Sequence, residues 1–354
     1  MTVTAGPNGP TGAKVRAAWT RTSLASGRPA DPFRERARRM GRRLVSVLGG
    51  EILFESASAE LLDIVDAAYA GLPSHTFAGS RPRLRIALEL LPGTGRIRAV
   101  PPPPSLGGGA GFLRATLDDS SFAVVYPQAG AALVTVSRDM LRFRYHVRYE
   151  LIEFAVYLLA ARSRGLVPLH AACVAEGGRG IVLAGASGAG KSTIALNCLA
   201  QGLKLVSEDS VMLEPISLRA TGIASFLHLR RESLQYVPAD WMSRVIGSPV
   251  IRRRSGVDKL EVDVRSVRGG CAARPVSLSA IIFASAARAG RGPLLTPLPP
   301  GELVRRLHRT QPYAVSQSQW PAFIRSVQQV PTFELRRRHH PQEAVEALHG
   351  LLSG

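Results

Sequence analysis

Short apolar stretches separated by turn residues fill the first half of the chain after residue 43. Alternating apolar and polar positions predict two strands over residues 44–54 around a Gly49-Gly50 turn, and residues 59–69 have the spacing of an amphipathic helix. Four more strands are expected at residues 84–90, 112–117, 122–126 and 132–136. The proline and glycine run at 101–111 is typical of a flexible loop or linker. Residues 44–145 are therefore predicted to form a small α+β domain.

Helices and more continuously apolar strands follow after residue 145. Helical spacing predicts an amphipathic helix over 145–162, whose aromatic side chains fit a packed core better than a ligand site. The remaining strands are expected at 166–175, 180–184, 203–207, 223–229, 277–284 and 331–335, and the helices at 194–200, 300–308, 319–328 and 342–352. This order predicts an α/β domain over residues 146–354.

Charge is concentrated at the start of the chain. Residues 1–43 carry ten basic and two acidic side chains and lack apolar periodicity, so they are predicted to form a disordered basic tail. The whole chain has a formal charge of +19, which can indicate nucleic-acid binding. No nucleic-acid-binding motif accompanies the charge, so a solvated basic surface that attracts an anionic nucleotide is the favoured interpretation.

Composition favours a cytoplasmic protein with no membrane partner. The sequence has no uninterrupted run of 18 apolar residues and no signal-peptide pattern at its start. The three cysteines are widely spaced and odd in number, which predicts reduced thiols and no metal site. Assembly into a homo-oligomer stays open at this stage.

The richest motif is a glycine-rich stretch that begins at residue 185. It fits the Walker A pattern G-x-x-x-x-G-K-[ST], with an apolar strand before it and a helix after it. Glycines let the backbone curl its N–H groups around a phosphate at the positive end of a helix. A plain turn between a strand and a helix is the alternative. The residues expected to contact the nucleotide are Gly185, Ala186, Ser187, Gly188, Ala189, Gly190, Lys191, Ser192 and Thr193.

Three side chains of this loop have distinct expected roles. The ammonium of Lys191 would contact the β and γ phosphates, and the hydroxyl of Ser192 would bind Mg²⁺. Thr193 is expected to cap the following helix. The implied cofactors are ATP and Mg²⁺.

Two further segments carry a resemblance to a known family. Leu169-His-Ala171 precedes the loop, and residues 202–209 place an acidic pair, Glu208 and Asp209, at the end of a short strand. Together with the loop, this order resembles the C-terminal kinase domain of the HPr kinase/phosphorylase family and its kinase-like relatives, over roughly residues 165–352. The resemblance implies a P-loop nucleotide domain of the HPr kinase and PEP carboxykinase type, behind the small α+β domain.

The resemblance also assigns catalytic roles. In that family a histidine and a carboxylate activate the acceptor hydroxyl, and a second acid helps to hold the metal. Transferred to this chain, these are His170, Glu208 as the base, and Asp209 on the metal side with Ser192. The alternatives are a core histidine for His170 and a merely solvated strand end for the two acids.

The sequence also departs from the family. Glu208 stands where the family has Asp, Thr193 replaces a glutamate, and the Glu-Val-Arg-Gly segment is not evident near residues 218–222. These departures argue against HPr as the substrate and against phosphorolysis.

The expected function is an HPr kinase-like phosphotransferase that moves a phosphoryl group from ATP to a hydroxyl, such as Ser, of a peptide, protein or small molecule. The alternative is an ATP-binding accessory protein without kinase activity. A nucleic-acid ATPase is disfavoured because no helicase or transporter signature accompanies the loop.

Overall fold

The computed structural model describes residues 40–78, 83–95 and 99–353, and it is a mixed α/β protein with parallel and antiparallel strand pairs. Residues Arg39–Gly354 form one compact unit. Most of the predicted basic tail lies outside the described residues. The first strand, β1 (Gly41–Val47), begins three residues before the expected position.

A seven-stranded sheet contains every strand expected before residue 145. Its order is β1-β2-β3-β7-β6-β5-β4, and β2, β3 and β7 pair in parallel. Alternate residues of β3 are buried, which is the pattern that predicted the strand. Besides β1, the strands are β2 (Gly50–Ser56), β3 (Leu84–Leu91), β4 (Ser105–Gly109), β5 (Phe112–Asp118), β6 (Ser121–Tyr126) and β7 (Ala131–Ser137).

Strand β4 corrects the expectation of a flexible loop at 101–111. Its five residues pair with β5, yet all five are exposed. A glycine-rich edge strand has no buried face, so no apolar alternation marks it in the sequence.

Two helices pack against this sheet. Helix α1 (Ala59–Tyr69) begins after Ser58, whose hydroxyl accepts a hydrogen bond from the Leu61 N–H. The predicted helix over 145–162 is present as three consecutive segments that share a core with the sheet: α2 (Arg144–His146), a π-helical turn (Val147–Ile152) and α3 (Glu153–Arg164). Short 3₁₀ turns lie at Pro127–Ala129 and Arg138–Phe143.

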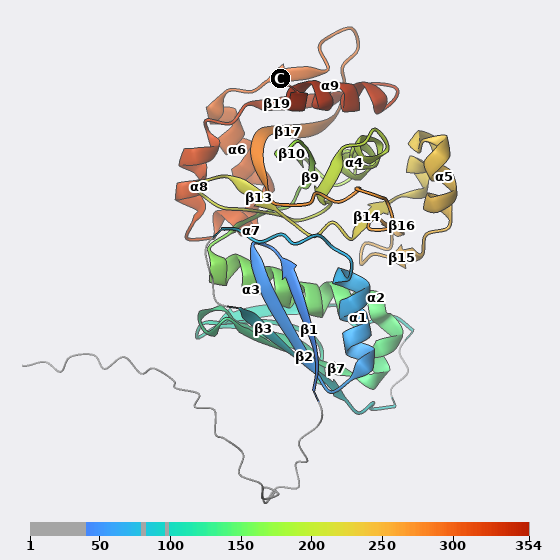
Figure 1. Cartoon of the computed structure of the whole chain (residues 1–354), viewed down its shortest axis with the longest axis vertical. Coiled ribbons are helices and arrows are strands. Elements are labelled where there is room, and N and C mark those ends of the chain that lie inside the picture. Colours follow the sequence, from blue (N-terminus) through green and yellow to red (C-terminus); the bar gives the residue numbers. More distant parts are fainter. Residues whose placement is uncertain (1–39, 79–82, 96–98, 354) are drawn as a thin grey trace, which may run out of the picture. The chain divides into compact units, whose positions relative to one another are not determined.

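The second large sheet has nine strands in three layers with its helices. Ile181 and Leu183 of β10 face a core with α4 and α9, whereas Val182 and Ala184 face a core with α6 and α8. Figure 1 shows these two helix pairs on opposite sides of β10 and β17. The strands are β8 (Val167–Leu169), β9 (Ala172–Glu176), β10 (Arg179–Ala184), β11 (Lys204–Ser207), β12 (Val211–Leu213), β13 (Arg219–Thr221), β17 (Val276–Arg288), β18 (Leu295–Pro297) and β19 (Thr332–Arg337).

The helices around this sheet match the expected positions within a few residues. They are α4 (Lys191–Ala200), α6 (Pro300–Thr310), α8 (Trp320–Val327) and α9 (Gln342–Ser353). Helices α5 (Ala239–Ile246) and α7 (Pro312–Val315) and a 3₁₀ turn (Arg231–Tyr236) were not predicted. A three-stranded sheet of β14 (Phe226–Leu229), β16 (Asp258–Asp263) and β15 (Val250–Arg252) was predicted only at β14.

The expected strand at 166–175 is two strands, and the break decides where the site forms. The main path of the sheet runs β11-β9-β10-β17-β13-β12-β8, so β8 and β11 are its two ends. Strand β9 is the neighbour of β11 at one end, and β12 is the neighbour of β8 at the other end. The polypeptide passes from β8 to β9 through residues 170–171 and from β11 to β12 through residues 208–210, so each connection runs from one end of the sheet to the other. The two ends of the sheet are therefore joined by these two short connections, which we call the seam.

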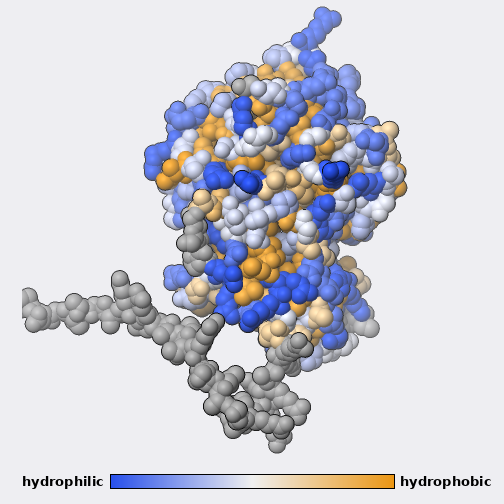
Figure 2. Space-filling view, viewed as in Figure 1, coloured by the Kyte–Doolittle hydropathy of each residue, from blue (hydrophilic) through white to orange (hydrophobic). Residues whose placement is uncertain are grey.

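Among the described residues, every helix is too short or too polar to cross a bilayer. On the face drawn in Figure 2, hydrophilic and hydrophobic residues are interspersed. The three cysteines are free, as expected, and two of them are buried.

Candidate functional site

The glycine-rich loop between β10 and α4 has a backbone that requires glycine. Gly185, Gly188 and Gly190 all have positive φ, of 142°, 79° and 96°. A Cβ at Gly185 would also lie 2.6 Å from the carbonyl oxygen of Ala284 on β17. The N–H groups of Gly188, Gly190 and Lys191 have no hydrogen-bond partner among the described residues. The loop thus presents free donors at the N-terminus of α4, where an anion is favoured.

Lys191 lies across this loop. Its Nζ donates to the carbonyl oxygens of Gly185 and Ala186, at 2.8 and 3.2 Å. Burial lowers the pKa of Lys191, although Asp209 and Glu208 nearby oppose the shift. An anion bound in the loop would favour the charged ammonium.

The hydroxyl of Ser192, one residue further, contacts the first of the two predicted acids. Ser192 Oγ donates to Glu208 Oε1 at 2.5 Å. Thr193 does not cap the helix: the N-cap is Gly190, and Thr193 Oγ1 donates to Ser233 Oγ at 3.0 Å instead. The helix begins at Lys191, three residues earlier than a cap at Thr193 would allow.

Glu208 is the first member of a buried network of alternating acidic and basic side chains. Its Oε2 lies 3.0 Å from His228 Nδ1, and His228 Nε2 lies 3.1 Å from Glu261 Oε1. Glu261 in turn binds the guanidinium of Arg148 in the π-helical turn. All four side chains are buried. This network of charged side chains therefore connects the glycine-rich loop with the segment that precedes α3.

In this network, hydrogen bonds and neighbouring charges shift the pKa of Glu208 and of His228 more strongly than burial does. Burial alone would raise the pKa of Glu208, but hydrogen bonds from His228 and Ser192 lower it. Burial alone would lower the pKa of His228, and its hydrogen bonds to Glu208 and Glu261 raise it. These opposite shifts favour an imidazolium between two carboxylates.

Asp209 has different surroundings from Glu208. Its carboxylate is 33% exposed, and its Oδ1 lies 3.2 Å from Nδ1 of His170. The hydroxyl of Tyr149 donates to Asp209 Oδ2 at 3.3 Å. Burial and the charge of Asp209 raise the pKa of Tyr149, so the phenol stays protonated. Asp209 is thus the accessible acid and Glu208 the enclosed one.

Gln311 fixes His170 at the seam. The side-chain oxygen of Gln311 accepts from the His170 N–H at 2.7 Å, and its Nε2 donates to the His170 carbonyl at 3.3 Å. Gln311 is itself buried. Both main-chain groups of His170 are satisfied in the strand break, which leaves the imidazole, at 56% side-chain exposure, free to face Asp209.

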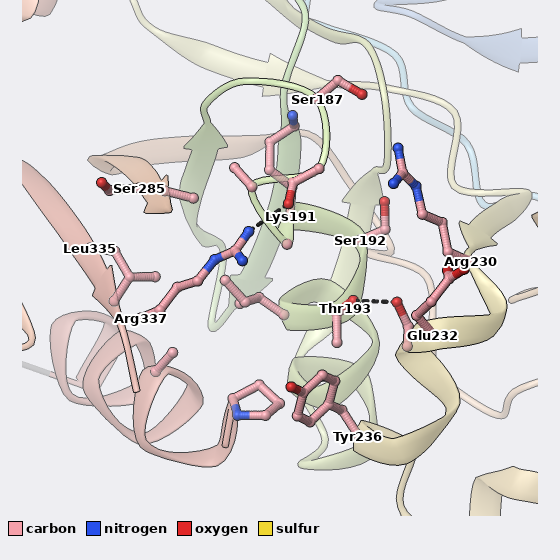
Figure 3. A pocket seen from close by; sticks show the side chains of 18 of the residues that line it. Ser187, Lys191, Ser192, Thr193, Arg230, Glu232, Tyr236, Ser285, Leu335 and Arg337 are labelled. Atoms are coloured by element: carbon pink, nitrogen blue, oxygen red, sulfur yellow. Dashed lines mark hydrogen bonds between the residues drawn. The ribbon is translucent and has the colours of Figure 1, made fainter. Parts of the chain in front are cut away.

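A cavity of about 380 Å³ lies over the loop. Figure 3 shows Lys191 and Ser192 at the loop and the start of α4, Arg337 extending toward the loop from the end of β19, and Arg230 on the side of Ser192, from the end of β14. Arg337 Nη2 donates to the Gly188 carbonyl at 2.5 Å. Six lysine and arginine side chains line this cavity, against the three carboxylates of Glu208, Asp209 and Glu232: Lys191, Arg230, Lys259, Arg336, Arg337 and Arg338. This lining suits a multiply charged anion.

The oxygen donors at the loop suit a magnesium ion carried in with phosphate. Among the described residues, no three His, Cys, Asp or Glu side chains are placed to hold a metal by themselves. Mg²⁺ is usually bound by one or two carboxylates together with substrate phosphates. Ser192 and Glu208 supply one hydroxyl and one carboxylate side by side.

The structure brings the predicted site residues together, with contacts that differ from the expected pairing. His170 contacts Asp209, and Ser192 contacts Glu208. The sequence predicted a strand over residues 223–229, and it gave His228 within that strand no role. It missed Glu261, Gln311 and Arg337, which have no local motif and reach the site from distant elements.

Comparisons with known proteins add little. No protein family model matches the chain, and no curated protein matches it. Among solved structures, the Hpr(Ser) kinase/phosphatase from Coxiella burnetii is similar over 52% of this chain and 94% of that chain, at 12% sequence identity and a TM-score of 0.28. A TM-score this low supports no inference about activity.

Proposed function

We propose that this protein is an ATP-dependent phosphotransferase that moves the γ-phosphoryl group of ATP to a hydroxyl. The observation that carries the proposal is the glycine-rich loop: it combines free N–H donors with Ser192 placed against a buried carboxylate. Loops of this type bind the phosphates of nucleotides. The second acid, Asp209, is accessible and lies beside His170, so it can accept the proton of an incoming hydroxyl.

The nucleotide would occupy the cavity over the loop. Its phosphates would accept from the loop N–H groups and from Lys191, which would exchange its carbonyl partners for phosphate oxygens. Apolar and aromatic residues at the same cavity, among them Tyr236, Leu294 and Leu335, would contact the base. Mg²⁺, held by Ser192 and Glu208 together with the phosphates, would neutralise charge on them.

In this proposal the two acids exchange the roles that the resemblance suggested. Glu208 is enclosed and bound to Ser192, so it belongs to the metal side. The Asp209 carboxylate is accessible and lies 3.2 Å from His170 Nδ1, so it accepts the acceptor proton. The acceptor oxygen then bonds to the γ-phosphorus, the bond from that phosphorus to the β,γ-bridging oxygen breaks, and ADP leaves.

Calorimetric titration with Mg-ATP tests the nucleotide site. Lys191→Ala is expected to weaken binding by at least about tenfold, because the loop loses its ammonium. Lys204→Ala is the matched control, since Lys204 on β11 lines neither this cavity nor its neighbour. Equal affinities for wild type and Lys191→Ala would rule out the loop as the phosphate site.

A phosphoryl-transfer assay distinguishes a phosphotransferase from an ATP-binding accessory protein, the two functions that the sequence left open. Incubation with labelled ATP and a panel of hydroxyl compounds should give a labelled product that needs Asp209. Tight ATP binding with no transfer to any compound would favour the accessory-protein alternative.

A further inference from the structure

A second cavity, of about 530 Å³, adjoins the first at the proposed catalytic residues. His170, Glu208, Asp209 and His228 line both cavities. The other lining residues belong to the second cavity alone and come from the π-helical turn, α3, β8, β12, β14, the end of α6, α7, the β4 segment and the loops beside them. A nucleotide in the first cavity and an acceptor in the second would therefore meet at Asp209, as in-line transfer requires.

The second cavity is lined largely by apolar side chains. Helix α3 presents Phe154, Tyr157 and Leu158 to it, at helical positions i, i+3 and i+4. These three residues pack against the core of the seven-stranded sheet, yet each is only partly buried. Further apolar lining comes from Pro104, Leu106, Pro168, Leu169, Met212, Ile223, Phe226, Pro312, Tyr313 and Ala314.

The charged groups at this cavity already have partners within the protein. Arg148 binds Glu261 and lies 3.3 Å from Glu153. Glu150 pairs with Arg254 at 2.5 Å. Charges that are paired and partly enclosed leave no strong site for a charged ligand, because a ligand would have to break an existing ion pair. The polar end of the cavity is the Asp209 and His170 pair.

From this lining we infer that the phosphoryl acceptor is an uncharged hydroxyl compound with an apolar body of small-molecule size. The inference rests on the proposed phosphotransferase function. The volume lies within the range of pockets that enclose drug-sized ligands. The apolar body would pack against α3, and the hydroxyl would point to the seam. Its proton passes to Asp209 as its oxygen bonds to the γ-phosphorus, and the products are ADP and a phosphate monoester.

Equilibrium binding of defined probes tests this inference. The uncharged probes are naphthol, hydroxybiphenyl and phenylbutanol; the charged counterparts are naphthalenesulfonate and biphenylcarboxylate, and an apolar serine-containing pentapeptide represents a peptide acceptor. Leu158→Trp should fill the cavity and weaken binding of an uncharged probe by at least about tenfold. Leu113→Trp is the matched control, because Leu113 on β5 is also partly buried against the same core and does not line the cavity.

A second variant protects the test against misfolding. Leu106 lines the cavity but is 67% exposed, so Leu106→Arg should leave the fold intact and still weaken binding. Preferential binding of the charged probes or the peptide would overturn the inference. So would the absence of binding by every uncharged probe at millimolar concentration, or binding that neither variant changes.

Mg-ATP titration of the same samples distinguishes a wrong acceptor assignment from a wrong proposed function. If wild type binds Mg-ATP but not the uncharged probes, the acceptor assignment fails and the nucleotide site stands. If wild type does not bind Mg-ATP, the proposed function itself fails.

Discussion

Ser192 Oγ donates a 2.5 Å hydrogen bond to Oε1 of Glu208, so the first acid of the Glu208-Asp209 pair is bound to the loop residue that would hold Mg²⁺. Asp209, one residue later, faces away to His170. Adjacent residues at a strand end point in different directions, and here they serve the two sides of the proposed reaction.

Glu208→Gln should therefore act on the metal side. The neutral amide would weaken Mg²⁺ binding, raise the Mg²⁺ concentration needed for activity, and reduce both phosphoryl transfer and background ATP hydrolysis. Activity measured across a Mg²⁺ series tests this. An unchanged Mg²⁺ requirement would return Glu208 to the role of base.

Asp209→Asn should act mainly on the transition state. Loss of the proton acceptor is expected to lower the transfer rate by about 10²–10⁴-fold with little change in Mg-ATP affinity. Single-turnover transfer and calorimetric titration measure the two effects separately. Full transfer activity in this variant would show that another group accepts the proton.

His228→Gln should destabilise the protein. The variant leaves Glu208 and Glu261 buried without the imidazolium between them, which is expected to cost about 2–5 kcal/mol of unfolding free energy. Urea denaturation measures the loss. His349→Gln is the control, because its contact with Glu176 is exposed and its loss should cost far less. Similar losses for the two variants would contradict a strongly paired buried histidine.

Arg337→Ala should weaken Mg-ATP binding by about tenfold, because Arg337 both holds the Gly188 carbonyl and adds positive charge over the loop. Arg337→Lys keeps the charge and should recover part of the affinity. Arg305→Ala is the control, since Arg305 lies on α6 and lines neither cavity. Titration at two salt concentrations would show a smaller salt dependence for Arg337→Ala than for the control.

Burial of His75, away from the candidate site, should make the folding stability of the protein sensitive to acid. Its Nε2 lies 2.7 Å from the Ala272 carbonyl and its Nδ1 3.1 Å from Thr221 Oγ1. Burial lowers the pKa of His75, although the bond to Ala272 opposes the shift. The unfolded chain therefore takes up a proton first, so stability present above about pH 6.5 is lost as the pH falls through the folded-state pKa.

Denaturation midpoints measured from pH 7.5 down to about pH 5 test this effect of His75. His75→Gln should have a smaller slope over that interval than wild type. Equal slopes would assign the acid sensitivity to other groups.

Much of the fold could be predicted because periodic burial marks its longer elements. Strand β3 alternates along its length, and the loop pattern between β10 and α4 requires glycine at positive φ. Strands β12, β13 and β15 have three residues each, which is too short for a period to be recognised. The exposed strand β4 lacks a buried face altogether.

The sequence identified several residues of the candidate site, but it did not predict which of them contact one another. Lys191, Ser192 and the acidic pair follow one another closely in sequence and could be found by motif. His228 and Glu261 join the site through pairing of β14 with β16, and Gln311 comes from between α6 and α7. Which acid faces Ser192 depends on how the chain turns after β11, where Ser207 Oγ donates to the Ser210 carbonyl at 2.6 Å, and no local pattern encodes that turn.

The seam has a consequence for folding kinetics. His170 and Asp209 meet only when β8 has paired with β12 and β9 with β11. The first pairing joins segments about 44 residues apart and the second joins segments about 31 residues apart. Loop closure of this length precedes any reward from the contact, so the pairings are expected to form late. A refolding chain would therefore regain helical signal before His170 and Asp209 meet, and any activity of the proposed site would return only after the helices have formed.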